Sequence, residues 1–246
     1  MTMSLTAVLH SEWIKIRSVR ASFGSLIAVF AVTQAVTLLV FATVGRAEAV
    51  HGEDPVFGAF YAVNFAQLAA IAFGATAVSS EYAGGALRIS LSAVPHRGLF
   101  YAARTMVVAG AALVVGLATA FVSFFTGQAF LGEYAISLGA PGALRACVGA
   151  GVYLALMALF AAGLTFLLRS AVAVLSLLVP FILIVSFVVG DIAGGAADWL
   201  PDRAGRQILY QDPPGGVGPW TGLAVTALWA AGAVLAGWWA LHRRDA

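Results

Sequence analysis

The chain contains six long runs of residues from which aspartate, glutamate, lysine, arginine and histidine are absent. Each run holds about 20 residues or more, and at 1.5 Å per residue a helix of that length crosses the ~30 Å hydrocarbon core of a bilayer. Backbone groups in lipid must satisfy one another, and the runs are continuously apolar instead of alternating, so they predict helices and not a barrel. The predicted spans are residues 23–44, 57–79, 105–130, 146–168, 171–190 and 219–241.

The composition excludes several other classes of protein. Hydrophobic residues make up 61% of the 246 positions and charged residues 10%, a balance that is not that of a soluble helical bundle. The net charge of +2 is too small to indicate binding to nucleic acid, and the single cysteine, Cys147, excludes an internal disulfide. The first apolar run exceeds the length of a secretory signal, so we expect it to be retained. The sequence predicts an all-α membrane protein that forms one transmembrane domain over residues 1–246.

The basic residues indicate how the chain is oriented, because lysine and arginine near helix ends favour the cytoplasm. With six spans, the N-terminal segment, the second loop, the fourth loop and the C-terminal tail share one side, and most of the 13 basic residues lie there. We therefore expect both termini in the cytoplasm. The basic residues on that side are Lys15, Arg17, Arg20, Arg88, Arg97, Arg104, Arg169, Arg243 and Arg244.

Residues 1–21 precede the first span and contain a predicted amphipathic helix. Val8, Trp13 and Ile16 share one side of the helical wheel, which is typical of a helix lying in the membrane interface. Glu12 falls within this apolar side, where an unpaired carboxylate is costly. Two interpretations remain open: the carboxylate reaches water at the interface, or it pairs with a loop arginine such as Arg88.

The loop of residues 81–97 has the features of a docking segment. The glycines at 84 and 85 allow a sharp turn, residues 86–93 predict a two-turn helix, and Pro95 ends it. Such a short helix is not stable alone, and its apolar residues need a surface, either a partner protein or the lipid headgroups. Its apolar residues are Leu87, Ile89 and Leu91. On the opposite side, the loop of residues 191–218 predicts a short helix that covers the outer end of the bundle.

Several membrane chemistries require side chains that this sequence does not place in its spans. All four histidines lie outside the spans, no span carries an ionisable group for ion coupling, and no P-loop is present. We therefore expect no catalytic residue, no metal ligand and no cofactor on this chain. The polar residues inside the spans are neutral, among them Gln34, Asn64 and Gln67, and interhelical hydrogen bonds explain them first.

Small residues and one proline predict how the spans pack. Pairs of small residues four apart indicate close helix approach, and Pro180 predicts a kink in the fifth span. The pairs are Gly116 and Ala120, Gly151 and Ala155, and Ala233 and Gly237.

In the order of these features the chain resembles the permease subunits of type-2 ABC transporters, a family of six-helix bacterial exporters, over essentially its whole length. Three segments carry the resemblance. They are Ser11-Glu12-Trp13-Ile14-Lys15-Ile16-Arg17-Ser18 before the first span, the loop from Ser80-Glu81-Tyr82 to Val94-Pro95-His96-Arg97, and Trp199-Leu200-Pro201 with Ala204-Gly205 before the sixth span.

The resemblance implies a role for each segment. The first, with Glu12 and Trp13, would be an elbow helix, and residues 86–93 would be the coupling helix that docks in a groove of a nucleotide-binding subunit. It also implies an assembly in the bacterial cytoplasmic membrane of two permease chains, identical or homologous, with two ATPase subunits that bind ATP and Mg. The residues implied in partner binding are Glu81, Leu87, Arg88, Ile89 and Leu91, and those implied near the substrate path are Gln34, Asn64 and Gln67.

The leading hypothesis is the transmembrane subunit of an ATP-driven exporter whose substrate is hydrophobic or amphipathic, such as a drug, a peptide or a lipid. The ATPase activity would lie on a separate subunit. A membrane assembly or sensory module without transport activity would present the same bundle and docking loop. An ion-coupled carrier is disfavoured because no span carries an ionisable group.

Overall fold

The computed structural model describes residues 5–43, 54–186, 188, 194–214 and 216–243. Most of this described part is helical, and it contains no strand. Its elements are α1 (Leu5–Ser18), α2 (Arg20–Thr43), α4 (Pro55–Phe60), α5 (Val63–Ser79), η1 (Ser80–Gly85), α6 (Ala86–Ala93), α7 (Arg97–Leu131), η2 (Gly132–Tyr134), α8 (Ala143–Leu168), α9 (Ala171–Pro180), η3 (Phe181–Val185), η4 (Gly194–Trp199), α11 (Pro201–Arg206), η5 (Gln207–Leu209) and α12 (Pro219–Arg243).

Five helical stretches in the described residues are long and apolar enough to cross a bilayer, which indicates a multi-pass membrane protein. They correspond to five of the six predicted spans. The stretches are Arg20–Thr43, Val56–Ala93, Arg97–Tyr134, Ala143–Leu168 and Pro219–Arg243. The first predicted span also included residue 44, which lies outside the described residues.

The fifth predicted span, residues 171–190, differs from its expectation. The apolar helix there is shorter, Ala171–Ile184, and it changes character at Pro180. A proline ring clashes with the carbonyl of the preceding turn, and the chain continues as the π-helical turn η3, which is a known way of absorbing such a clash. The predicted kink is therefore a change of helix type, while residues 187 and 189–190 lie outside the described part.

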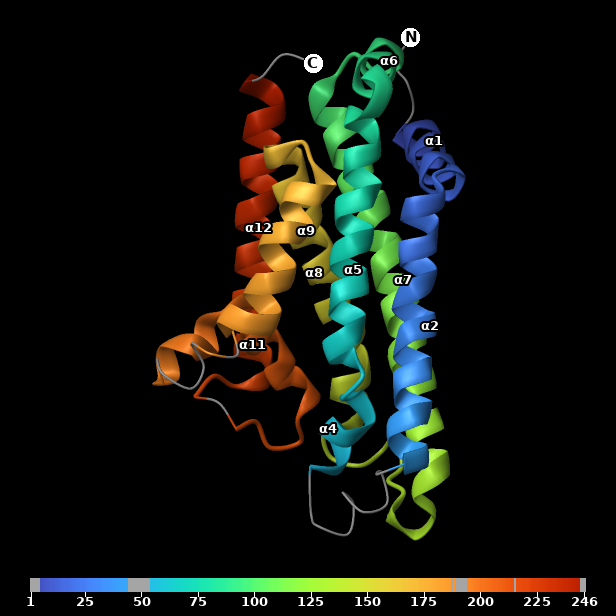
Figure 1. Ribbon diagram of the computed structural model, residues 1–246, viewed down its shortest axis with the longest axis vertical. Helices are drawn as coiled ribbons and strands as arrows, with labels where there is room; N and C mark the ends of the chain where they lie inside the picture. Colours follow the sequence, from blue (N-terminus) through green and yellow to red (C-terminus); the bar gives the residue numbers. More distant parts are fainter. Residues whose placement is uncertain (1–4, 44–53, 187, 189–193, 215, 244–246) are drawn as a thin grey trace.

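The helices form an elongated bundle around α8, which packs most extensively against α12, α7 and α5 (Figure 1). The helix α2 packs against α5 and α7, and α1 lies beside α7. The C-terminal end of α12 lies at the same end of the bundle as α1 and α6, and we call this the α6 end (Figure 1). The helices α4 and α11 lie toward the other end, which we call the α11 end. The predicted short helix of the 191–218 loop is present as α11, packed on α12.

Glycines allow the central helices to approach closely. A Cβ added to Gly163 would come within 2.5 Å of the Ala233 backbone, and one added to Gly237 within 2.6 Å of the Gly163 carbonyl oxygen. A Cβ on Gly116 would likewise meet the Gly151 carbonyl oxygen at 3.0 Å. The small-residue pairs thus lie at the α7–α8 and α8–α12 contacts, and the predicted close packing is confirmed.

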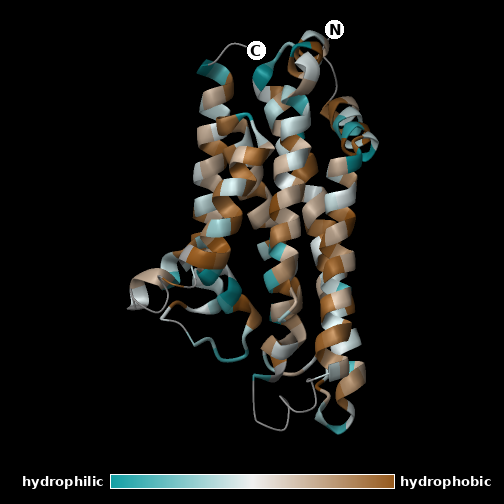
Figure 2. Ribbon diagram, viewed as in Figure 1, coloured by the Kyte–Doolittle hydropathy of each residue, from teal (hydrophilic) through white to brown (hydrophobic). Residues whose placement is uncertain are grey.

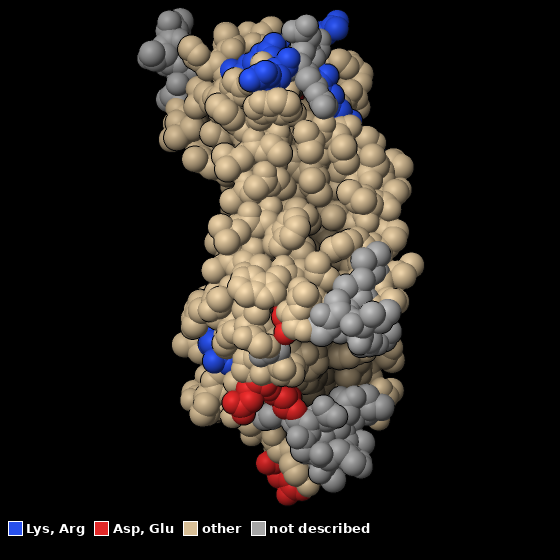
Figure 3. Space-filling view, turned by 90° about the vertical axis from the view of Figure 1, so that its left-hand side faces the viewer, with Lys and Arg blue, Asp and Glu red and all other residues tan. Residues whose placement is uncertain are grey.

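Polar and charged residues gather toward the two ends of the bundle, and apolar residues occupy the long middle section (Figure 2). On the flank that carries α12, lysine and arginine cluster at the α6 end, and aspartate and glutamate lie toward the α11 end (Figure 3). This polarity has the same sense as the predicted orientation, in which the basic end faces the cytoplasm.

Candidate functional site

The helix α6 spans Ala86–Ala93, the bounds expected for the docking helix. Gly84 and Gly85 before it have φ values of 59° and 77°, in the left-handed region where side chains other than glycine are strained. They turn the chain sharply out of α5 and η1. After Ala93 the chain leaves the helix at Val94, before Pro95, as the residue preceding a proline disfavours helix.

The two sides of α6 have different surroundings. Leu87 is 4% exposed and Ser90 is also buried, so this side faces the bundle. Leu91 is partly buried and packs against the core. The other side presents Arg88 and Ile89 to the outside, and Ile89 is 71% exposed. Of the residues expected to bind a partner, Arg88 and Ile89 are therefore the ones at the surface.

Glu81 and Leu87 were expected to bind a partner, but they do not lie at the surface. Both side chains are buried in the bundle, so in this conformation neither reaches a partner directly. The reason is geometric: η1 carries Glu81 inward, beneath the turn made by the two glycines, and Leu87 is on the bundle side of α6. Their contribution to any docking would be to hold α6 in position.

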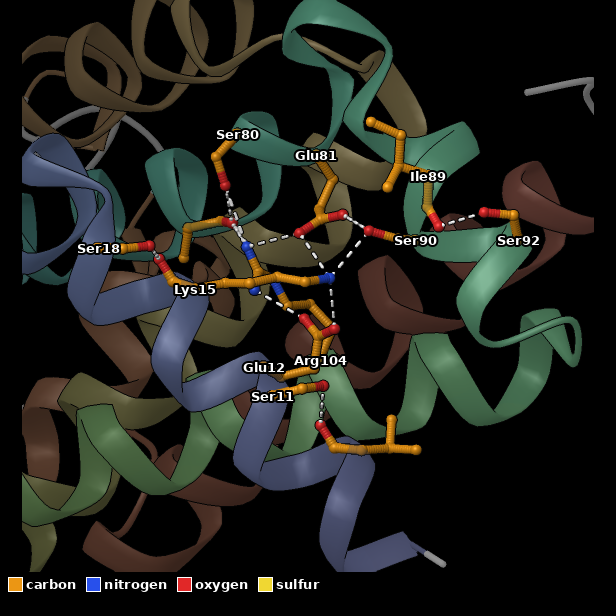
Figure 4. Close-up of polar contacts among 12 residues, drawn as sticks. Ser11, Glu12, Lys15, Ser18, Ser80, Glu81, Ile89, Ser90, Ser92 and Arg104 are labelled. Carbon is orange, nitrogen blue, oxygen red and sulfur yellow. Dashed lines mark hydrogen bonds and ion pairs between the residues drawn. The ribbon is translucent and has the colours of Figure 1, made fainter. Parts of the chain in front are cut away.

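Beneath α6 lies a group of four charged side chains, Glu12, Lys15, Glu81 and Arg104, which we call the charge cluster (Figure 4). Arg104 Nη1 lies 2.7 Å from Glu12 Oε2, and Arg104 Nη2 lies 3.3 Å from Glu81 Oε1. Lys15 Nζ lies 2.7 Å from Glu12 Oε1 and 3.3 Å from Glu81 Oε1. Each cation therefore bridges both carboxylates, and the cluster joins α1, η1 and α7.

Serine residues connect the charge cluster to its neighbours. Ser90 of α6 donates a hydrogen bond to Glu81 Oε2 at 2.7 Å and accepts one from Lys15 Nζ at 2.9 Å. Arg104 Nη2 donates to Ser80 Oγ at 3.0 Å and to the carbonyl oxygen of Ala77, in the last turn of α5. Through Ser90, the outward-facing helix α6 is hydrogen-bonded to the same charges that hold α1, α5 and α7 together.

The charge cluster is buried and formally neutral. The side chain of Arg104 is 0% exposed and that of Glu12 is 1%, while Lys15 is partly open at 34%. Two carboxylates face two cations, so each buried charge has a partner of opposite sign. Removing one member would leave a charge in a low-dielectric site, which is far more costly than removing an exposed pair. Within the described residues, Arg104 Nε has no hydrogen-bond partner.

The structure decides between the two interpretations of Glu12. Glu12 is buried and does not reach water; it pairs with an arginine that the sequence placed in the second loop, but that arginine is Arg104 and not Arg88. Arg104 was expected in the loop between the second and third spans, but α7 begins at Arg97, so Arg104 is two turns inside a helix. The ionisable groups that the predicted spans lack thus lie just outside the first three of them, in α1, η1 and the first turns of α7. One feature of the sequence could have indicated that Arg104 is buried. Arg104 lies at the edge of an apolar run, at a spacing of four residues from Phe100 and Val108, which are buried on the same side of α7.

Trp13, expected in the elbow helix, is partly buried against the core from α1, one residue after Glu12. The helix α1 itself is present over Leu5–Ser18, and Val8, Glu12 and Ile16 make its buried stripe. Their spacing of four residues gives one inward-facing side, as expected for an amphipathic helix.

The three residues expected near a substrate path are hydrogen-bonded within this chain. Gln34 of α2 donates to Ser123 Oγ of α7 at 2.9 Å and to the Thr119 carbonyl oxygen at 3.2 Å. Asn64 Oδ1 accepts a 2.5 Å bond from Arg206, and buried Gln67 accepts a bond from the hydroxyl of Tyr153. The interhelical hydrogen bonding that explained these residues first is confirmed. A role in a path stays a prediction.

The chain was compared with protein-family models, with curated proteins and with solved structures, and none of them matched. The site therefore has to be interpreted from its own geometry. It is a short helix exposed on one side and connected on the other side, through one hydrogen-bonded serine, to a buried cluster of charges from three further elements.

Proposed function

We propose that this chain is the transmembrane permease subunit of an ATP-binding cassette exporter, with ATP and Mg bound by a separate nucleotide-binding subunit. The observation that carries the proposal is the two-sided construction of α6. Ile89 and Arg88 face outward, while Ser90, one residue further on, is bonded to Glu81 and Lys15 of the charge cluster.

This construction suits a helix that receives a push from a partner. A short helix has little stability of its own, so a load on its outer side passes to whatever holds its inner side. Here the inner side is held by buried, paired charges from α1, η1 and α7, which cannot separate without exposing an unpaired charge. A displacement of α6 would therefore move the ends of α1, α5 and α7 together, and rigid-body shifts of helices are a common way of switching a membrane pathway.

The rest of the proposed assembly follows from the family resemblance and from the bundle. Two permease chains, identical or homologous, would lie in the bacterial cytoplasmic membrane with the α6 end in the cytoplasm, and would bind two ATPase subunits there. Between the charge cluster and Asp202 of α11, the buried side chains of the described residues are apolar or neutral polar, which suits a hydrophobic or amphipathic substrate such as a drug, a peptide or a lipid. Gln34, Asn64 and Gln67 are the proposed residues near its path.

The proposal is tested by reconstitution with the ATPase encoded in the adjacent reading frame, if that frame contains a P-loop. We expect ATP hydrolysis by the ATPase to rise when the permease is present in proteoliposomes. Ile89→Asp should abolish that rise, because a carboxylate at the centre of an apolar docking contact is strongly unfavourable. Leu144→Asp, a change at an exposed leucine at the other end of the bundle, should leave the rise intact.

The same experiment separates the proposal from its alternatives. A membrane assembly or sensory module would bind a partner without moving a substrate. ATP hydrolysis that is stimulated while inside-out vesicles take up no hydrophobic dye on addition of ATP would favour such a module. An ion-coupled carrier would lose transport on addition of an uncoupler and would be indifferent to Ile89→Asp. Loss of stimulation in both Ile89→Asp and Leu144→Asp would argue against a specific role for α6.

A further inference from the structure

A large apolar pocket lies on the flank of the bundle away from the charge cluster. Its volume is about 740 Å³, and its walls come from α8, α9, α12 and the segment that leads into α11. Residues from each wall include Phe160, Leu178, Phe181, Trp199, Leu228 and Gly232. This volume is within the range of pockets that enclose a small molecule or part of a lipid.

The walls of this pocket offer an occupant almost no hydrogen bonds. The lining side chains are hydrocarbon apart from two tryptophans. The indole N–H of one, Trp229, already donates to the carbonyl oxygen of Trp199 at 3.1 Å. A ligand that brought polar groups into the pocket would lose their hydrogen bonds to water without replacing them. The chemistry of the walls therefore selects a plain hydrocarbon chain.

The exposed face of α12 beside the pocket has the pattern of a surface in contact with lipid. Trp220 near its start and Trp238 and Trp239 near its end are all exposed. They are separated by 18 residues, or about 27 Å of helix, which matches the ~30 Å hydrocarbon core of a bilayer with tryptophan at both interfaces. Between them the face is apolar, with Leu228 and Leu235 exposed, and this flank carries no lysine, arginine, aspartate or glutamate across its middle (Figure 3).

We propose that this pocket binds an acyl chain of a bilayer phospholipid, which inserts between α9 and α12 at a depth between the two tryptophan positions. Leu228 and Gly232 lie within that interval, so a chain can reach the pocket without leaving the hydrocarbon layer. A second copy of this chain is a poorer occupant, because exposed tryptophans near both ends of α12 are typical of a face that meets lipid. The bound chain would also contact Leu177, Leu178 and Phe181, which flank Pro180 at the change of helix type.

The proposal is tested by photolabelling of the purified protein in nanodiscs that contain a phosphatidylcholine with a diazirine in the middle of one acyl chain. Labelled residues are located by mass spectrometry. We expect the yield at pocket residues such as Phe181 and Leu228 to exceed the yield at Leu38 and Leu39, which are exposed on α2. A specific pocket retains a chain, whereas an ordinary lipid-facing surface exchanges its lipids freely.

Gly232→Phe provides the decisive variant. A Cβ at Gly232 meets no atom within 4 Å, so the ring can fill the pocket without pushing helices apart. The excess labelling of Phe181 and Leu228 should then be lost. Gly24→Phe is the matched control, because Gly24 is an exposed helical glycine on α2 whose Cβ would also meet open space. It should leave pocket labelling unchanged. Should Gly232→Phe fail to give folded protein, Leu177→Phe fills the same pocket from α9.

Three outcomes would overturn the proposal. One is equal labelling of the pocket and the α2 face, which would mean contact with bulk lipid only. Another is pocket labelling that persists in a folded Gly232→Phe or Leu177→Phe protein. The last is efficient crosslinking between two copies of the chain through Leu228→Cys, which would show that a second copy covers the pocket.

Discussion

The two ends of the bundle hold their peripheral segments in different ways. At the α6 end, one cluster of four charged side chains connects α1, η1 and α7 and reaches α6 through Ser90. At the α11 end, the segment of residues 194–214 is attached by separate contacts spread along it. These include Ser186 to Asp202 at 2.6 Å, Thr226 to the Pro201 carbonyl oxygen at 2.7 Å, and the Gln211 amide to Asp54 at 2.8 Å.

This difference indicates how each end of the bundle responds when one of its segments is displaced. The charges of the cluster share partners, so a change at one member weakens the pairing of the other buried charges. The three contacts named at the α11 end involve different residues, and one can be lost while the rest remain. The α6 end is thus suited to move as a unit, and the α11 end to stay closed as a cap. The comparison predicts a graded series of effects on the free energy of unfolding.

The largest effect is expected for Arg104→Met. This change leaves two buried carboxylates, Glu12 and Glu81, with Lys15 as their one remaining partner in the cluster, and we expect a loss of about 3–5 kcal/mol in the free energy of unfolding. Denaturant titration of the detergent-solubilised protein, followed by circular dichroism, measures it. The double variant Glu81→Gln, Arg104→Met restores neutrality, keeps the 2.7 Å Lys15–Glu12 pair and should recover most of the loss. A double variant as unstable as Arg104→Met alone would show that charge pairing is not the cause.

A smaller effect is expected for Asp202→Ala at the other end. Asp202 is buried and accepts a hydrogen bond from Ser186, so its removal leaves that hydroxyl without its partner, at a cost of about 1–3 kcal/mol. Asp202→Asn retains an acceptor and should cost less. The same titration compares the two variants. Were Asp202→Ala to cost as much as Arg104→Met, the two ends would not differ in the way inferred from their contacts.

Asn64→Ala removes one of the separate attachments, the bond from Arg206. Because Arg206 is partly exposed and can bind water instead, we expect a loss of about 0.5–1.5 kcal/mol. Asp202→Ala is not a suitable second change, because Arg206 contacts both Asn64 and Asp202. Thr226→Val is used instead, since it removes the separate bond to the Pro201 carbonyl oxygen. The effects of Asn64→Ala and Thr226→Val should add, and a clearly non-additive pair would contradict independent attachment.

The smallest effect is expected for Ile89→Asp. Ile89 is exposed and outside the charge cluster, so the free energy of unfolding should change by no more than about 0.5 kcal/mol. The variant thus separates docking from folding: it should unfold like the wild type and yet fail to stimulate a partner ATPase. A large loss of stability would place Ile89 in the fold and remove its use as a probe of docking.

Local features of the sequence were sufficient to predict α6 and the long apolar helices. Gly84, Gly85 and Pro95 act on their own backbone, so the bounds of α6 follow without knowledge of its surroundings. The charge cluster could not be predicted in the same way, because Glu12 and Arg104 are separated by 92 positions and meet only when α1 packs beside α7.

The fifth predicted span was predicted only in part. Hydropathy recognises Ala171 and the residues after it as apolar and Pro180 predicts a kink, but neither shows that the helix continues as a π-helical turn. The apolar pocket was also beyond prediction, since its walls come from four segments that are far apart in the sequence.

The most direct test of the account is the side of the membrane on which α6 lies and whether a partner covers it. Ile89→Cys can be labelled with a membrane-impermeant maleimide, and background is low because the native Cys147 is buried. We predict labelling in inside-out vesicles but not in right-side-out vesicles, and protection when the cognate ATPase is bound. Labelling of Ile89→Cys in right-side-out vesicles would contradict the account, because a cytoplasmic ATPase could then not reach α6.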